Sequence, residues 1–81
     1  MRVLVVDDHE LTRFSLKLAL SVQNNIELVG LASICKQAIE MVEQHRPDMI
    51  ILDSQMPGMN GLSIYNYIKS IAPNAQIIVL R

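Results

Sequence analysis

Three aspartates directly follow two short apolar segments of this 81-residue chain. Asp7 and Asp8 come immediately after Val3–Val6, and Asp53 comes immediately after Met49–Leu52. Such segments, rich in β-branched residues, are typical of strands buried within a parallel sheet, and the carboxyl ends of neighbouring strands lie side by side. We therefore expect the three carboxylates to converge. Because like charges that close repel unless a cation lies among them, and oxygen ligands favour a hard ion, the sequence predicts a Mg²⁺ site acting on phosphate.

The rest of the chain predicts the sheet that would position these aspartates. Strand-like and helix-like segments alternate, which favours right-handed strand–helix–strand units and a parallel sheet covered by helices. The expected strands are Val3–Val6, Ile26–Leu31, Met49–Leu52 and Ile77–Leu80. The apolar faces of the intervening helices are predicted from helical spacing to be Leu11, Phe14 and Leu18; Cys35, Ala38, Ile39 and Val42; and Gly61, Ile64, Tyr65 and Ile68.

The outer strands differ in composition. Ile26–Leu31 contains a charge at Glu27 and alternates in polarity, as an edge strand does. Ile77–Leu80 is wholly apolar, which is typical of an interior strand, yet Arg81 is the next and last residue. A doubly wound sheet should not end on an interior strand. We therefore expect residues 1–81 to form one partial domain, with no second domain.

Composition excludes several classes of protein. Hydrophobic residues make up 51% of the chain, too many for intrinsic disorder. No apolar run approaches the roughly 18 residues of a membrane span, and the first one ends in aspartates, unlike a signal peptide. A net charge of −1 without a basic cluster argues against nucleic-acid contact by this segment. The single Cys35 excludes an internal disulfide and is consistent with a cytoplasmic location.

From Arg2 to Leu80, the chain resembles the receiver domain of two-component response regulators, a flavodoxin-like three-layer α/β/α fold. The resemblance rests on Val5-Val6-Asp7-Asp8-His9, on Leu52-Asp53 and on Met56-Pro57-Gly58-Met59-Asn60-Gly61. The Asp-Asp-His start and the following Arg13 are most similar to receivers of the NarL/LuxR type, which carry a helix-turn-helix output domain.

The resemblance implies a role for individual residues. Asp53 matches the aspartate that accepts a phosphoryl group from a sensor histidine kinase. Asp7 and Asp8 match the acidic pair that holds Mg²⁺, and Gln55 matches the position that offers its backbone carbonyl to the metal. The turn after the phosphorylation site, and the start of the next helix, are matched by Pro57, Gly58 and Gly61.

The chain also departs from the family pattern. The fifth strand of a complete receiver, with its phosphoryl-contacting lysine, follows the fourth strand and is absent here. Arg81 stands where a threonine or serine hydroxyl usually reports phosphorylation. We therefore expect phosphoryl transfer to be impaired. We also expect the exposed fourth strand to pair with a second copy or with a complementing chain.

Other interpretations compete with this one. The chain could be a self-associating α/β fragment without phosphotransfer. A Mg²⁺-dependent phosphatase is less favoured, because it needs a second aspartate two residues after the nucleophile, where Gln55 stands. A lone aspartate at a strand end is usually a loop residue or helix cap, and only the convergence with Asp7 and Asp8 argues otherwise for Asp53. We expect His9 to be a polar residue of the first helical turn, with no role in metal binding.

Overall fold

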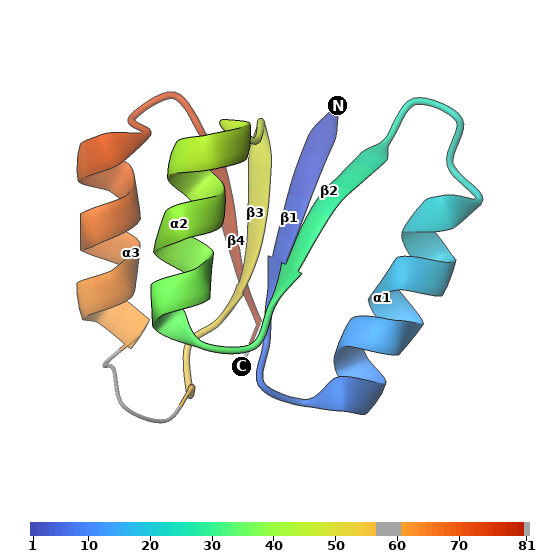
Figure 1. The fold of residues 1–81 in the computed structure, drawn as a ribbon, viewed down its shortest axis with the longest axis horizontal. Helices are drawn as coiled ribbons and strands as arrows, with labels where there is room; N and C mark the ends of the chain where they lie inside the picture. The colour runs from blue at the N-terminus through green and yellow to red at the C-terminus, as the bar shows by residue number, and fades with distance from the viewer. Residues whose placement is uncertain (57–60, 81) are drawn as a thin grey trace.

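Strands and helices alternate along the chain as the sequence predicts. The computed structural model describes residues 1–56 and 61–80. In these ranges the elements are β1 (Arg2–Val6), α1 (Glu10–Ser21), β2 (Glu27–Ala32), α2 (Cys35–His45), β3 (Met49–Asp53), α3 (Gly61–Ile71) and β4 (Gln76–Leu80), as Figure 1 shows. Each predicted strand is found within one residue of its expected bounds.

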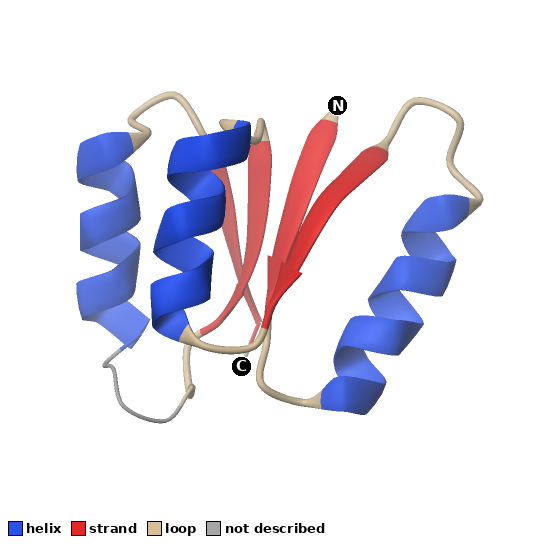
Figure 2. Cartoon of the chain, viewed as in Figure 1, coloured by secondary structure: helices blue, strands red, loops and turns tan. Residues whose placement is uncertain are grey.

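The strands form one parallel sheet between two helical layers. Their order is β2-β1-β3-β4, so β1 and β3 lie in the middle and the strand ends at the lower edge of Figure 1 are all carboxyl ends. α2 and α3 cover one face, and α1 lies on the other, as Figure 2 shows. The predicted three-layer α/β/α arrangement with a parallel sheet is confirmed for the described residues.

The central strand β1 is apolar throughout because both of its faces are covered. Leu4 and Val6 pack towards α2 and α3, while Val3 and Val5 pack on the α1 side. All four are essentially inaccessible to solvent. Full burial of a side chain of this size contributes about 1.5–3 kcal/mol to the stability of the fold. This burial holds β1 in the centre of the sheet and so positions Asp7, the residue that follows it.

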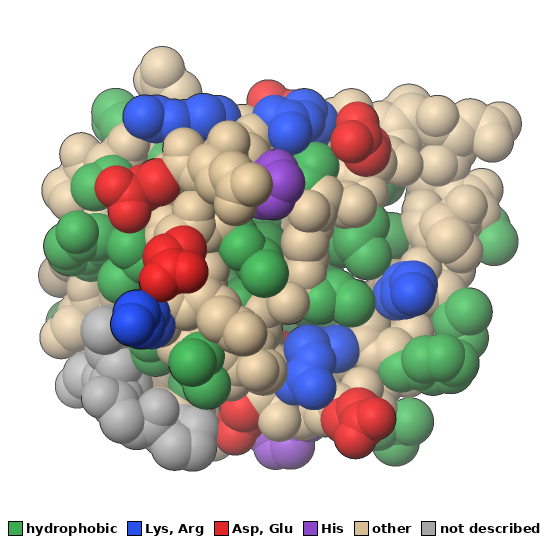
Figure 3. Space-filling model, in the orientation of Figure 1, with side chains coloured by type: hydrophobic (Ala, Val, Ile, Leu, Met, Phe, Trp, Pro, Cys, Tyr) green, Lys and Arg blue, Asp and Glu red, His purple; other side chains and the backbone are tan. Residues whose placement is uncertain are grey.

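Helix α1 covers its face of the sheet loosely. Leu16 and Leu20 pack against the sheet, but no residue of α1 is fully buried. The face predicted to be apolar does not face the core, because Leu11, Phe14 and Leu18 are all more than half exposed. Hydrophobic side chains accordingly gather on the surface over α1 at the right of Figure 3.

The two outer strands are β2 and β4. The edge position predicted for β2 is confirmed. Within the described residues β4 pairs with β3 alone, although its sequence is typical of an interior strand. Ile78 and Val79 are therefore 39% and 47% exposed, and their apolar surface is available for contact.

Gly30 lies where β2 and α2 approach each other closely. A Cβ atom added to Gly30 would lie 2.9 Å from Met41 Sδ and 3.1 Å from Leu4 Cδ1. Gly30 pairs with Leu4 just after an irregularity in the β1–β2 register. None of the helices in the described part of the chain has the length and apolar character needed to cross a bilayer.

Candidate functional site

The sheet register brings the predicted aspartates to one edge. Val6 pairs with Leu52 across β1 and β3, so Asp7 and Asp53, each the next residue, lie on adjacent strands at the same end. The backbone N–H of Asp7 also donates to the carbonyl of Ala32 at 3.0 Å, which ties this end of β1 to the end of β2. The side-chain positions therefore follow from strand pairing.

Four potential metal ligands meet at this edge. One ligand atom each from Asp7, Asp8, His9 and Asp53 lies within 4.8 Å of all the others. Asp7 and Asp53 are buried, and Asp8 is partly exposed. The structure thus brings together all three carboxylates that the sequence identified.

Backbone N–H groups orient two of the carboxylates. The N–H of His9 donates to Asp7 Oδ1 at 2.7 Å, and the N–H of Gln55 donates to Asp53 Oδ1 at 2.9 Å. The Arg13 guanidinium donates to the backbone carbonyl of Asp7 at 2.7 Å, anchoring α1 to the same edge. Because bonds from fixed backbone groups restrict side-chain rotation, the carboxylates are held in place before any ligand arrives.

The sequence did not predict that the ring of His9 lies in this acidic cluster. Its Nδ1 lies 2.8 Å from Asp7 Oδ1, 3.1 Å from Asp8 Oδ1 and 3.5 Å from Asp53 Oδ2. His9 is the N-cap residue of α1, but its side chain makes no capping hydrogen bond. The available signal was its position directly after the aspartate pair, which does not specify where the ring points.

The donor set fits a divalent cation. Three carboxylates supply hard oxygen ligands of the kind that Mg²⁺ prefers. Asp8 Oδ1 is buried and has no hydrogen bond to the described residues, although the His9 ring lies close to it. A buried carboxylate oxygen without a hydrogen bond is costly, and a bound cation would offset that cost.

The remaining predicted site residues are placed as follows. Gln55 has an exposed side chain next to Asp53, while the role predicted for its backbone carbonyl stays a prediction. Gly61 is the first residue of α3. Pro57, Gly58 and Arg81 lie outside the described residues. The end of β4 approaches the site, because the N–H of Ser54 donates to the Leu80 carbonyl at 3.3 Å.

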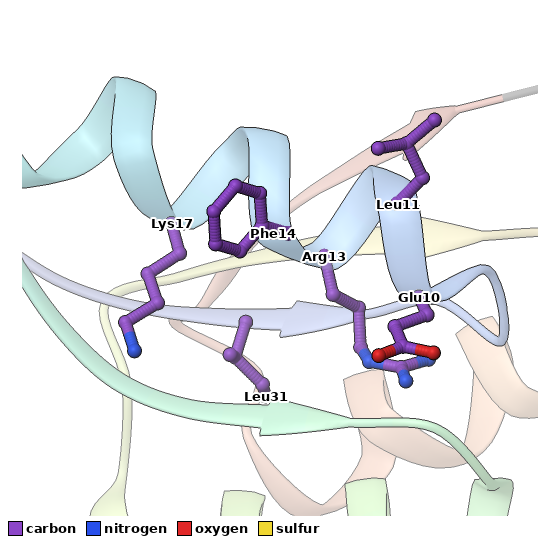
Figure 4. A pocket seen from close by; sticks show the side chains of 6 residues that line it. All are labelled: Glu10, Leu11, Arg13, Phe14, Lys17 and Leu31. Atoms are coloured by element: carbon purple, nitrogen blue, oxygen red, sulfur yellow. The ribbon is translucent and has the colours of Figure 1, made fainter.

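A groove of about 530 Å³ lies beside this edge, between α1 and β2. Its lining is mostly from α1, and Leu31 lies on β2, as Figure 4 shows. The residues that line it are Glu10, Leu11, Arg13, Phe14, Lys17 and Leu31. None of the clustered aspartates lines the groove, so the groove and the acidic cluster are separate features.

Sequence comparisons agree with this arrangement. Residues 3–81 match the family model of the response regulator receiver domain. The chain is 36% identical over 80 residues to the response regulator protein VraR of Staphylococcus saprophyticus, covering 99% of this chain and 38% of that protein. It is 39% identical over 77 residues to the nitrate/nitrite response regulator protein NarL of Escherichia coli, covering 95% of this chain and 36% of that one. The chain thus spans less than two-fifths of the length of these relatives.

Solved structures share the fold. The isolated REC domain of RcsB from Salmonella enterica serovar Typhimurium, determined with the phosphomimetic BeF₃⁻, superposes with a TM-score of 0.91 at 28% identity, over 98% of this chain and 59% of that one. The response regulator domain of Thermotoga maritima CheB gives a TM-score of 0.86 at 32% identity, over 98% of this chain and 58% of that one.

Proposed function

This chain belongs to the response regulator receiver domain family, and from that membership we propose that Asp53 accepts a phosphoryl group with Mg²⁺ bound beside it. The observation that carries the proposal is the convergence of four ligand atoms within 4.8 Å at the carboxyl edge of the sheet. Asp7, Asp8 and Asp53 would hold the metal through side chains, and Gln55 would do so through its backbone carbonyl.

In the proposed phosphoryl transfer, Asp53 is the nucleophile and the neighbouring groups position it and offset charge. An oxygen of Asp53 attacks the phosphorus atom of the donor, forming a new O–P bond while the bond from phosphorus to the donor nitrogen breaks. That electron pair leaves with the donor imidazole, which takes up a proton from solvent. Bound Mg²⁺ would neutralise charge on the phosphoryl oxygens as they approach the carboxylates. The N–H of Gln55 restrains Asp53 during this step.

The proposed donor is a sensor histidine kinase in the cytoplasm, as the family's general role implies. We propose no turnover of an external substrate, because Asp53 is itself the acceptor. A phosphatase would use a second aspartate at the position of Gln55, whose exposed amide side chain cannot act as a general acid. Transcription control, which the resemblance to NarL/LuxR-type receivers with a helix-turn-helix output domain implies, is a proposal for a longer protein only.

We further propose that residues 1–81 by themselves are labelled slowly. The resemblance implies a lysine that contacts the phosphoryl group and lies outside these residues. Positioned cationic contacts of this kind typically supply several kcal/mol to phosphoryl transfer. The polypeptide should therefore retain acceptor chemistry at reduced yield.

Labelling with acetyl phosphate tests both proposals. Intact mass should show one added phosphoryl group on a small fraction of the chain, and this signal should require Mg²⁺ and be absent in Asp53→Asn. The matched control is Asp48→Asn at the opposite end of β3, which should label like the wild type. Labelling that persists in Asp53→Asn would overturn the acceptor assignment, whereas complete labelling of wild type would overturn only the impairment.

A second proposal concerns self-association through β4. Ile78 and Val79 on this edge strand are 39% and 47% exposed. A second copy pairing along β4 would bury them in a two-fold contact, with about 800 Å² per partner needed for a stable dimer. Light scattering at micromolar concentration should give a dimer for wild type and for Gln76→Lys, but a monomer for Val79→Lys. A wild-type monomer would exclude this proposal.

A further inference from the structure

The His9 side chain lies in the acidic site and does not serve the helix that it begins. Its side chain makes no capping bond, although the residue occupies the N-cap position of α1. Its backbone N–H is bound to Asp7 Oδ1 at 2.7 Å, which fixes the main chain close to the carboxylates. The side chain is 51% exposed, so burial by other residues does not force the ring inward.

The spacing of the ring nitrogen from the carboxylate oxygens matches that of ligands sharing one metal ion. Octahedral ligands about 2.1 Å from a metal lie about 3.0 Å from their neighbours at right angles. His9 Nδ1 is 2.8, 3.1 and 3.5 Å from oxygens of three different aspartates, and the shortest of these contacts is a hydrogen bond with Asp7 Oδ1. These separations bracket that value, so one cation could be held by the nitrogen and the three oxygens together.

We propose that His9 Nδ1 is a direct metal ligand, which makes this site a mixed nitrogen–oxygen centre that favours ions such as Co²⁺ over Mg²⁺. The proposal rests on the proposed function, since it concerns the same cation site. Imidazole nitrogen suits the later first-row divalent ions, whereas carboxylate oxygen suits Mg²⁺. Removing the imidazole should therefore weaken Co²⁺ binding much more than Mg²⁺ binding.

A different role for the ring gives a different result. If the His9 ring were only a hydrogen-bonded neighbour of the carboxylates, it would move out of the cluster when any cation bound there. Its removal would then change the affinity for every metal by a similar factor. The ratio of the Co²⁺ and Mg²⁺ dissociation constants separates these two roles, because a general effect on the site cancels in that ratio.

The experiment is calorimetric titration of the 81-residue chain with Co²⁺ and with Mg²⁺. Loss of a group that merely supports a ligand typically costs ten- to a hundredfold in metal affinity, so losing the ligand itself should cost at least about tenfold. We expect His9→Ala to lower the preference for Co²⁺ by about that factor and to shift the visible absorption of bound Co²⁺. His45→Asn, which removes the histidine at the far end of α2, is the control and should change neither quantity.

The outcomes separate the inference from the proposed function. An unchanged Co²⁺ to Mg²⁺ ratio and spectrum in His9→Ala would overturn the ligand assignment, even if Mg²⁺ binding still required Asp53. If the folded wild-type chain bound neither ion, both proposals would be wrong. Far-UV circular dichroism checks folding, which should persist because the His9 side chain makes no capping bond.

Discussion

Replacing Asp53 with asparagine should stabilise the metal-free protein. The ligand oxygens of the three aspartates lie within 4.8 Å of one another. At that separation two unit charges repel by about 3.5 kcal/mol for an effective dielectric constant of about 20. Asp53→Asn removes two such pairs but keeps an oxygen that can accept from the N–H of Gln55. Because His9 and the backbone donors already offset part of the repulsion, we expect a net gain of about 1–3 kcal/mol.

Urea denaturation followed by circular dichroism measures this gain, in EDTA and in Mg²⁺. Wild type should gain about 1.4 kcal/mol from Mg²⁺ at ten times its dissociation constant, and Asp53→Asn should gain much less. Asp48→Asn is the matched control, because Asp48 is exposed and its carboxylate accepts from the Arg2 N–H, a bond that an amide oxygen can replace. If Asp53→Asn proved no more stable than wild type in EDTA, the repulsion argument would be refuted.

Three further outcomes are expected. Gly30→Ala should destabilise the fold by about 1–3 kcal/mol in urea denaturation, because its Cβ would meet Met41 Sδ and Leu4 Cδ1. The same substitution should cost less in a Met41→Ala background, and an equal cost in both backgrounds would show that the Met41 contact is irrelevant. Ile50→Ala should cost about 2–5 kcal/mol by the same assay, since Ile50 is fully buried in the central strand β3, and a smaller loss would indicate a core that collapses around the cavity. Burial raises the pKa of the Cys35 thiol, so less thiolate is present at neutral pH; iodoacetamide should react with Cys35 more slowly than with free cysteine, and urea should remove the difference.

The strands and the acidic edge could be predicted because they depend on local pattern. The apolar runs before Asp7 and Asp53 specify buried parallel strands, and parallel pairing then brings the strand ends together. The face of α1 could not be predicted in the same way. Leu11, Phe14 and Leu18 have the right spacing, yet Leu16 and Leu20 contact the sheet, since packing against a particular surface decides the rotation of a helix.

Other features depend on contacts that no local pattern encodes. The apolar composition of β4 indicates that its side chains can be buried but does not say how many strands flank it. The position of the His9 ring depends on side-chain torsions within a cluster assembled from two strands. The close packing around Gly30 likewise arises from the approach of Met41 on α2 and of Leu4 on β1.

The pairing of β1 with β3 has a consequence for folding kinetics. The two halves of the acidic site are distant in sequence and meet only when these non-consecutive strands associate, with α1, β2 and α2 between them. Forming such non-local contacts is slow, because chain entropy is lost before the contacts stabilise the structure. A slip of one residue between β1 and β3 would also turn Asp53 to the other face of the sheet. Cation binding should therefore develop late in refolding. The time at which the refolding chain gains the ability to bind a cation would then report when β1 and β3 reach the correct register.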